Sequence, residues 1–268
     1  MAAPAETSIL SGLTHELRTP LNSILMLSEL LEESLAEGAA AGSGPGREPG
    51  QGQPPAGGKA EREARYARNI RQAAEDLLEL VNQAGELGRV ESGRFPLEAR
   101  PFATADLARR LAESWREAAG APEAVAHGGS TGAAHGGKAR LAVERTASAP
   151  ETVVTDPAKL LRAAELVVSG ALHASQGGAV AVALEAASGG GLAIRVADSG
   201  PPLSPAEAEA LFVPFGGAGP RTARRFGGTG LGLSVAHGLA RLLGGELTAE
   251  PGPAGQGCAF VLSIPASR

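Results

Sequence analysis

Leucine and isoleucine recur at steps of three and four residues along 7–36, which is the spacing of one apolar stripe on a helix. The stripe comprises Leu10, Leu13, Leu17, Leu21, Ile24, Leu27, Leu31 and Leu35. A second helix is predicted over 61–87, with an inner face formed by Ile70, Ala74, Leu77, Val81 and Ala84. One hairpin of two such helices buries only part of its stripes. We therefore expect two copies to pair as a four-helix bundle, which makes the protein a homodimer.

The segment between these helices has a different composition. Residues 37–59 are mostly Gly, Pro, Ala and Gln, and such a stretch buries too little apolar surface to offset the entropy lost on ordering. We predict a disordered loop there, and a second Gly-rich loop over 120–138.

Short apolar runs after residue 95 predict strands separated by helices. The expected strands lie near 140–145, 152–154, 179–184, 192–197, 246–249 and 259–264, and the expected helices at 104–118, 157–174 and 232–243. Strands and helices in this mixed order indicate one sheet covered on one face by helices. We expect two domains, an all-α helical hairpin over 1–95 and an α/β two-layer sandwich over 96–268.

Composition and charge exclude several classes of function. A net charge of −5 argues against nucleic acid as the main partner, because neutralising phosphates requires a basic surface. The single cysteine, Cys258, excludes an intrachain disulfide framework and a thiolate metal cage, and it suits a reducing cytosol. The sequence predicts no membrane span and no secretion signal, so we expect a cytoplasmic chain.

His15 carries the first candidate chemistry. At about 100° per residue its ring lies roughly opposite the apolar stripe, whereas Thr19 and Asn22 fall on its own side of the helix. A solvent-facing imidazole nitrogen can attack an incoming γ-phosphoryl group. Glu16 is placed to hydrogen-bond the other ring nitrogen or to take its proton. For a lone histidine, an exposed residue on an ordinary helix is the simpler interpretation.

The neighbours of His15 add a resemblance to a known family. Residues 15–22, HELRTPLN, resemble the histidine box of two-component sensor histidine kinases, and the similarity resumes at 87–94, LGRVESGR. In that family the histidine is autophosphorylated from ATP, and its phosphate passes to an aspartate on the receiver domain of a response regulator. The resemblance implies that His15 is the phosphoacceptor. It also implies supporting roles for three neighbours. Glu16 assists the phosphoryl transfer, and Thr19 or Asn22 positions water for the reverse, phosphatase reaction.

A glycine-rich segment carries the second candidate chemistry. Residues 226–234, FGGTGLGLS, run straight into a predicted helix, and such a segment lets backbone amides and the helix N-terminus approach a polyphosphate. Upstream, VADSG at 196–200 ends a predicted strand, and LFVPF at 211–215 lies between the two. In this order the segments resemble the aspartate box, phenylalanine box and glycine-rich lid of the Bergerat-type ATPase fold of histidine kinases.

The resemblance implies an ATP site in the second domain. Its expected residues are Asp198, Gly200, Arg225, Gly228, Thr229, Gly230, Leu231, Gly232 and His173. In such proteins the aspartate accepts a hydrogen bond from the adenine amino group, a role that falls to Asp198. Arg224 and Arg225 either pair with phosphates or are solvated loop charges, and both interpretations stay open.

Four positions depart from the family pattern. Gly170 stands where the magnesium-ligating asparagine belongs, and Leu166 stands where a second polar residue is common. Gly170 offers no side-chain oxygen to a hard cation, so we expect Mg²⁺ to be bound weakly, by phosphates and water, with no protein ligand. His173 stands where the family has a phosphate-facing Lys or Arg, and it either substitutes for that residue in part or is an ordinary histidine on the helix surface. Pro202 replaces a glycine of the aspartate box.

These departures leave three hypotheses. The leading one is a homodimeric histidine kinase core whose catalysis the losses would weaken. The alternative is a pseudokinase of the same fold that acts as a phosphatase, a phosphorelay or a regulator-binding scaffold. The third is a dimerisation module with a vestigial second domain.

Overall fold

A computed structural model describes residues 4–41, 56–93, 95–115, 140–175, 177–215, 226, 230–252 and 257–266. The chain divides into two compact units, Met1–Asn82 and Gln83–Arg268. The predicted Gly-rich loop over 120–138 lies outside the described residues.

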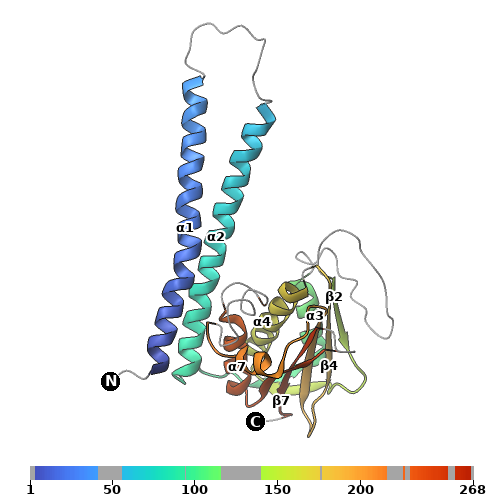
Figure 1. The fold of residues 1–268 in the computed structure, drawn as a ribbon. Coiled ribbons are helices and arrows are strands. Elements are labelled where there is room, and N and C mark those ends of the chain that lie inside the picture. Colours follow the sequence, from blue (N-terminus) through green and yellow to red (C-terminus); the bar gives the residue numbers. More distant parts are fainter. Residues whose placement is uncertain are drawn as a thin grey trace. The chain divides into compact units, whose positions relative to one another are not determined.

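Two long helices account for most of the described part of the first unit. α1 spans Pro4–Ala41 and α2 spans Ala56–Glu91, and the two lie side by side (Figure 1). The predicted helix pair is confirmed, but both helices are longer than expected. The prediction of a loop over 37–59 is wrong at both ends, because helix extends to Ala41 and resumes at Ala56. Alanines at 39–41 are strong helix formers, and they continue the helix after its apolar stripe has ended.

The inner stripe of α2 follows a heptad spacing. The half-buried or buried apolar side chains on this stripe are Ile70, Ala73, Leu77, Leu80, Ala84 and Leu87. The prediction placed Ala74 and Val81 on this face, but both are exposed. Steps of three and four alternate along the stripe, as they do in a supercoiled helix pair, and the sequence allowed either choice at each step.

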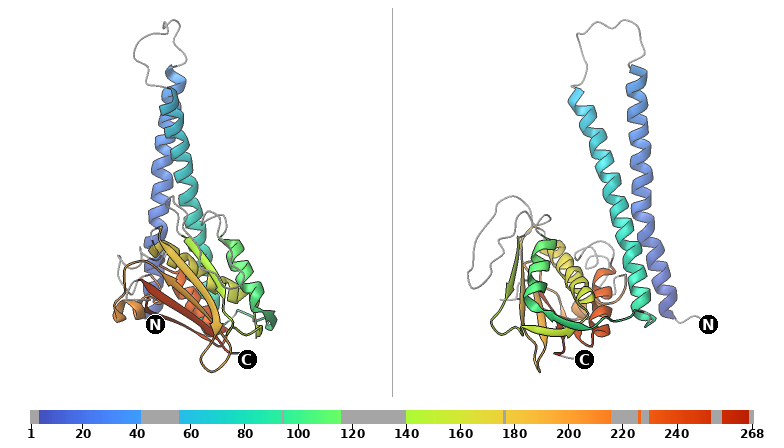
Figure 2. Two further views of the ribbon diagram at one scale, coloured as in Figure 1. Left: turned by 90° about the vertical axis from the view of Figure 1, so that its right-hand side faces the viewer. Right: turned by 180° about the vertical axis from the view of Figure 1, so that it is seen from behind.

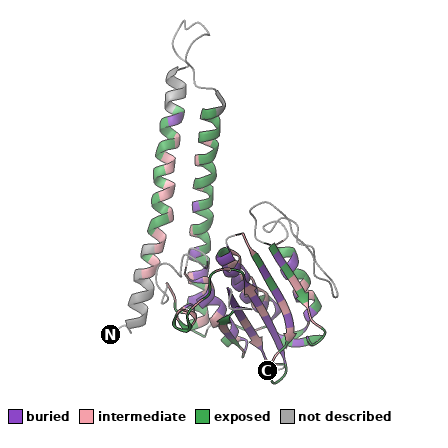
Figure 3. Cartoon of the chain, turned by 45° about the vertical axis from the view of Figure 1, so that its right-hand side comes forward, coloured by how far each residue is buried: buried purple, intermediate pink, exposed green. Residues whose placement is uncertain are grey.

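Much apolar surface of the hairpin stays uncovered within one chain. Figure 3 colours most of α1 and α2 as exposed or intermediate, in contrast to the buried interior of the sheet. The exposed large apolar side chains of the two helices are Leu21, Leu25, Met26, Leu30, Leu35, Leu78 and Val81. One polar pair lies inside the hairpin, where Ser34 Oγ donates to Glu63 Oε1 at 3.0 Å.

A five-stranded sheet forms the centre of the second unit. Its strand order is β2-β4-β5-β7-β6, and only β2 and β4 are parallel. The strands span Arg140–Arg145 (β2), Ala179–Ala186 (β4), Leu192–Asp198 (β5), Glu246–Pro251 (β6) and Cys258–Ile264 (β7). A separate antiparallel pair joins β1 (Arg100–Ala103) to β3 (Thr152–Thr155). All but β1 were predicted.

Helices cover one face of the five-stranded sheet. These helices are α3 (Thr104–Ser114), α4 (Pro157–Ser175) and α7 (Gly232–Leu242). Alternate residues of β5 and β7 point into the layer between sheet and helices, so that Ile194, Phe260 and Leu262 are almost fully buried. Figure 2 shows this two-layer arrangement, which confirms the predicted sandwich. A short helix that was not predicted, α5 (Pro205–Ala210), follows β5.

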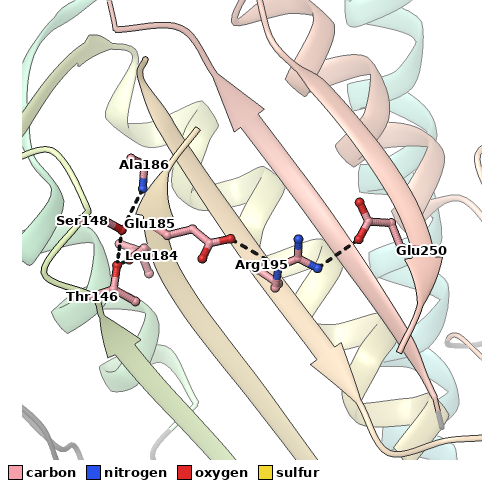
Figure 4. A network of polar contacts seen from close by, with 7 residues as sticks. All are labelled: Thr146, Ser148, Leu184, Glu185, Ala186, Arg195 and Glu250. Atoms are coloured by element: carbon pink, nitrogen blue, oxygen red, sulfur yellow. Dashed lines mark hydrogen bonds and ion pairs between the residues drawn. The ribbon is translucent and has the colours of Figure 1, made fainter. Parts of the chain in front are cut away.

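The opposite face of the sheet carries charged side chains. Arg195 on β5 donates to Glu185 Oε1 at 3.3 Å and to Glu250 Oε2 at 3.1 Å (Figure 4). At the edge of the sheet, Thr146 Oγ1 donates to the Leu184 carbonyl at 2.9 Å. Polar pairs on this face, with apolar residues on the other, explain the alternating pattern of the strands.

The last turns of α2 belong to the second unit. Arg162 on α4 donates hydrogen bonds to both carboxylate oxygens of Glu86, from Nε to Oε1 at 3.3 Å and from Nη2 to Oε2 at 3.0 Å. Val90 packs so closely on α7 that a Cβ at Gly238 would lie 2.7 Å from its Cγ1. Residues 83–91 are therefore an integral part of the α/β unit.

The segment after α2 is fastened to the start of α4. The Phe95 ring lies between two cations, with Arg89 Cζ at 5.0 Å and Lys159 Nζ at 4.7 Å from its centroid. Asp156 caps α4 and accepts hydrogen bonds from Glu98 N at 2.9 Å and Lys159 Nζ at 2.6 Å. These contacts fix the segment that links α2 to β1 against the N-terminal end of α4.

Among the described helices, none combines the length and the apolar composition that crossing a membrane requires.

Candidate functional site

The predicted phosphoacceptor segment, residues 15–22, lies inside α1. The side chain of His15 is outside the described part of the structure. Glu16 is half-buried, and Thr19 and Asn22 are exposed. Because these three residues are spaced three apart, they follow one another along one side of the helix.

Asp198 closes β5 at the edge of the α/β core. The period of the strand turns its side chain toward the helix layer, the same side as Val196, and the residue is 4 % exposed. Its Oδ1 accepts a hydrogen bond from the backbone N of Gly200 at 2.7 Å. A buried carboxylate at a strand end suits an amino group of a ligand, since a buried acceptor is strongly favoured by a matching donor.

Glycines allow close packing on both sides of Asp198. A Cβ at Gly200 would lie 2.6 Å from the Ala174 carbonyl of α4. A Cβ at Gly257, which has φ +68°, would overlap the Asp198 carbonyl oxygen. Downstream of Pro202, Ser204 forms a capping box that starts α5.

The phenylalanine segment contacts Gly230 of the glycine-rich segment and the helix α7 that follows it. Phe215 has φ +59°, and its backbone N donates to the Gly230 carbonyl at 3.1 Å. Phe212 stacks on His237 of α7, with ring centroids 5.0 Å apart. Burial, followed by the nearby charge of Arg241, lowers the pKa of His237, so that the ring is neutral in this stack.

The glycine-rich segment is described at Phe226 and from Gly230 onward. Arg225, Gly228 and Thr229 lie outside the described residues, as does Arg224. Gly230 has φ +63°, Leu231 is fully buried, and Gly232 begins α7. α7 thus begins two residues after Gly230, and the N-terminal end of a helix favours anions.

The α4 face that meets α7 is apolar. Gly170 is buried, and a Cβ placed there would lie 3.4 Å from the Phe226 carbonyl and 3.6 Å from Leu233 Cδ2. Leu166 is 4 % exposed, and its Cδ2 lies 3.7 Å from the Cβ position of Gly232. His173 lies apart from this face: it is exposed, and its Nδ1 is 2.9 Å from the Ser169 carbonyl.

Two family models match the chain at its two ends. Residues 5–93 match the His Kinase A (phospho-acceptor) domain, and residues 155–268 match the histidine kinase-, DNA gyrase B- and HSP90-like ATPase. The chain belongs to the sensor histidine kinases of two-component systems. The first match contains residues 15–22, and the second contains Asp198 and the glycine-rich segment.

Curated relatives agree with this assignment. The chain is 25 % identical to the autoinducer 2 sensor kinase/phosphatase LuxQ of Vibrio parahaemolyticus, over 98 % of its own length and 27 % of the relative. It is 31 % identical to the sensor-like histidine kinase R01002 of Rhizobium meliloti, over 98 % of this chain and 43 % of the relative. The chain thus spans less than half the length of these relatives.

Solved structures show the same fold. Full-length ShkA in complex with AMPPNP superposes with a TM-score of 0.58 at 23 % identity, covering 98 % of this chain and 46 % of ShkA. The histidine kinase AdeS of Acinetobacter baumannii gives a TM-score of 0.56 at 19 % identity, covering 93 % of this chain and 98 % of AdeS. The predicted fold class, a helical hairpin followed by an ATPase-type α/β sandwich, is confirmed.

The residues around the nucleotide site do not fit Mg²⁺. Mg²⁺ prefers an octahedron of oxygen ligands, whereas Leu166, Gly170 and Leu233 offer no side-chain oxygen. Glu165, the nearest carboxylate in sequence, is turned toward α3, where Ser114 Oγ donates to its Oε1 at 2.9 Å. Within the described residues, no group of three or more His, Cys, Asp or Glu side chains is arranged to hold a metal ion.

Sequence reasoning missed two residues that shape this site. Gln83 is 3 % exposed, and its side chain lies 3.7 Å from the Cβ position of Gly232 at the start of α7. Nothing local marks it, because its position depends on how α2 meets α7. Gly257 supports the Asp198 backbone, and its only sequence signal is a Gly-rich turn immediately before a strand.

Proposed function

We propose that this histidine kinase core autophosphorylates His15 from ATP and passes the phosphoryl group to an aspartate on the receiver domain of a response regulator. The observation that carries the proposal is the joint occurrence, in one chain, of a phosphoacceptor domain over 5–93 and a histidine kinase-like ATPase domain over 155–268. Residues 1–95 would serve dimerisation and phosphotransfer, and residues 96–268 would bind ATP.

His15 is the proposed nucleophile. One ring nitrogen attacks the γ-phosphorus, the bond from that phosphorus to the bridging oxygen breaks, and ADP leaves with the electron pair. Glu16 accepts the proton of the other ring nitrogen. Thr19 and Asn22 follow on the same side of α1, and we assign to them the positioning of water for dephosphorylation.

The ATP site we propose lies between the end of β5, α4 and the start of α7. Asp198 accepts a hydrogen bond from the adenine amino group, and Gly200 lets the ligand approach the backbone. The residues proposed to face the phosphates are Arg225, Gly228, Thr229, Gly230, Leu231 and Gly232. His173, which the resemblance also implies, lies apart from the α4 face that meets α7, and we assign it no contact with the phosphates. Any Mg²⁺ is held by phosphates and water, which agrees with the apolar side chains on α4.

A homodimer and a receiver domain are the proposed partners. The exposed leucines of α1 and α2 form an apolar surface that a second hairpin would cover. The exposed side chains around residue 15 leave that segment of α1 open to a regulator. A net charge of −5 gives no basis for nucleic acid binding, and we place the protein in the cytoplasm.

The test is phosphorylation with γ-labelled ATP and Mg²⁺. Wild type is expected to acquire an acid-labile label and to pass it to a cognate regulator, whereas His15→Gln is expected to remain unlabelled. His127→Gln is the matched control, because it removes a histidine outside both matched domains and should leave the label unchanged. Label that persists on His15→Gln would refute the assignment of the phosphoacceptor.

Gly170 and Leu166 favour one alternative, a pseudokinase that keeps the phosphotransfer surface without useful ATP turnover. It would act as a phosphatase, a phosphorelay or a regulator-binding scaffold. Incubation with a phosphorylated regulator separates the two functions. Back-transfer of phosphate to His15, without labelling from ATP, would support the pseudokinase.

A further inference from the structure

The two ends of the nucleotide site differ in chemistry. At the end of β5, Asp198 is buried and holds Gly200 N at 2.7 Å, so this end offers a carboxylate and close-packed backbone. Where α4 meets α7, the side chains of Leu166 and Leu233 and the bare backbone of Gly170 face one another, and the polar groups nearby are the Phe226 carbonyl and the neutral amide of Gln83, with no carboxylate among them. One end is built for hydrogen bonds, and the other for packing.

At the second end, apolar atoms and one backbone carbonyl lie in ordinary contact with the Cβ position of Gly170. The Cβ position of Gly170 is already in van der Waals contact with the Phe226 carbonyl and with Leu233 Cδ2, at 3.4 and 3.6 Å. Leu166 Cδ2 makes a similar contact, at 3.7 Å, with the Cβ position of Gly232. Among the described residues around Gly170, Glu165 is the nearest carboxylate in sequence, and it accepts a hydrogen bond from Ser114 Oγ of α3.

We infer that this site binds adenine nucleotides equally well with and without Mg²⁺, so that it recognises the nucleotide and not its metal complex. The inference rests on the proposed nucleotide site and adds the form of its ligand. Its physical basis is thermodynamic linkage. Mg²⁺ can tighten nucleotide binding only if the protein–nucleotide complex binds Mg²⁺ more tightly than the free nucleotide does. Side chains without oxygen atoms give the metal no such gain.

The decisive measurement is the dissociation constant of ATP on the whole chain, in saturating Mg²⁺ and in excess EDTA. A His15→Gln background prevents phosphoryl transfer during the titration. We expect the two constants to agree within about threefold. A larger tightening by Mg²⁺ would overturn the inference.

Loss of binding distinguishes this inference from the proposed function. If ATP bound in neither condition, the proposed nucleotide site would fall, and the inference with it. If ATP bound with a clear preference for Mg²⁺, the inference alone would fall. Asp198→Asn is expected to weaken binding to the same extent in both conditions, because it acts at the adenine end.

A pair of substitutions at Gly170 tests the physical cause. Gly170→Asn adds an amide oxygen, and it should raise the advantage of Mg²⁺ over EDTA to about fivefold or more. Gly170→Ala adds only the Cβ, which the structure accommodates at 3.4 Å, and it should leave the ratio near one. Equal ratios in both variants would overturn the assignment to this face, and the wild-type comparison stands even if one variant misfolds.

Discussion

Asp198 keeps its position because two glycines let the chain close around it. Gly200 lies against the Ala174 carbonyl of α4, and Gly257 lies against the carbonyl of Asp198 itself. Gly257 also has φ +68°, a conformation that glycine adopts at little cost. The site thus depends on a residue that would touch no ligand.

Gly257→Ala is expected to lower the free energy of unfolding by about 3 kcal/mol, because it combines backbone strain with a steric overlap. Gly189→Ala is the matched control. Gly189 has a similar φ of +88° but open space around its Cβ position, so its cost should be about 1 kcal/mol. Urea denaturation of both variants measures the difference. Equal losses would show that strain alone matters at Gly257.

Asp156 makes stability depend on pH. Burial by itself raises the pKa of this carboxyl, but the hydrogen bonds from Lys159 Nζ and from the backbone N–H groups of Glu98 and Lys159 outweigh burial, and the pKa lies below its ordinary value of 3.8. The folded state therefore favours the carboxylate. Its contribution is complete above about pH 4 and is lost as the pH falls through the lowered pKa.

Asp156→Asn should cost about 2 kcal/mol at pH 7, and much less at pH 3, where wild type has begun to lose the same interactions. Denaturation curves at the two pH values measure this change. Asp106→Asn is the control, because Asp106 makes an exposed ion pair with Arg109 and should cost under about 0.5 kcal/mol. A constant cost of Asp156→Asn at both pH values would refute the linkage.

At the scale of elements, the end of α2 contacts both α4 and α7 in the second unit. Glu86 meets α4 through Arg162, Val90 packs on Gly238 of α7, and Gln83 lies beside Gly232. Both helices that flank the nucleotide site therefore rest on the same short stretch of α2. A change in that stretch would reach α4 and α7 directly.

A double-mutant cycle on Glu86→Gln and Arg162→Gln should give a coupling of about 1 kcal/mol, since the pair is bidentate and Glu86 is largely buried. The same cycle on Arg71 and Glu75, an exposed pair 3.8 Å apart on α2, should give under about 0.3 kcal/mol. Chemical denaturation provides both values. Indistinguishable couplings would mean that the Glu86 contact adds nothing beyond a surface pair.

At the scale of the whole molecule, the hairpin exposes more apolar surface than a monomer normally keeps. Leu25 is 55 % exposed and Leu78 is 62 % exposed, although both lie on long, regular helices. A second hairpin packed on this surface would bury such side chains and complete a four-helix bundle. The proposed dimer therefore follows from what one chain leaves uncovered.

Leu25→Glu combined with Leu78→Glu is expected to weaken dimerisation at least about tenfold, because a charged group would replace an apolar contact at each site. Sedimentation equilibrium measures the dissociation constant. Glu29→Lys, an exposed change of charge on the same helix, serves as the control and should alter it much less. A dimer unaffected by the double substitution would place the interface elsewhere.

Local periodicity explains why so much of this fold could be predicted. Apolar residues recur with the period of a helix in α1 and α2 and with the period of a strand in β4, β5 and β7. Each period extends over enough residues to predict its type of element. β1 escaped prediction because it is short, contains Pro101, and is held by pairing with β3. α5 was not predicted, although Ser204 and Glu207 have the spacing of a capping box.

The sequence by itself determined the family, the order of the two domains and the loss of oxygen ligands at Gly170 and Leu166, because these are written in contiguous motifs. Only the tertiary structure decided what faces those two positions and that the end of α2 joins the α/β unit. The reason is physical: the Gly170–Leu233, Asp198–Gly257 and Glu86–Arg162 contacts join residues far apart in the chain. Such contacts depend on how helices pack on a sheet, which no local spacing records.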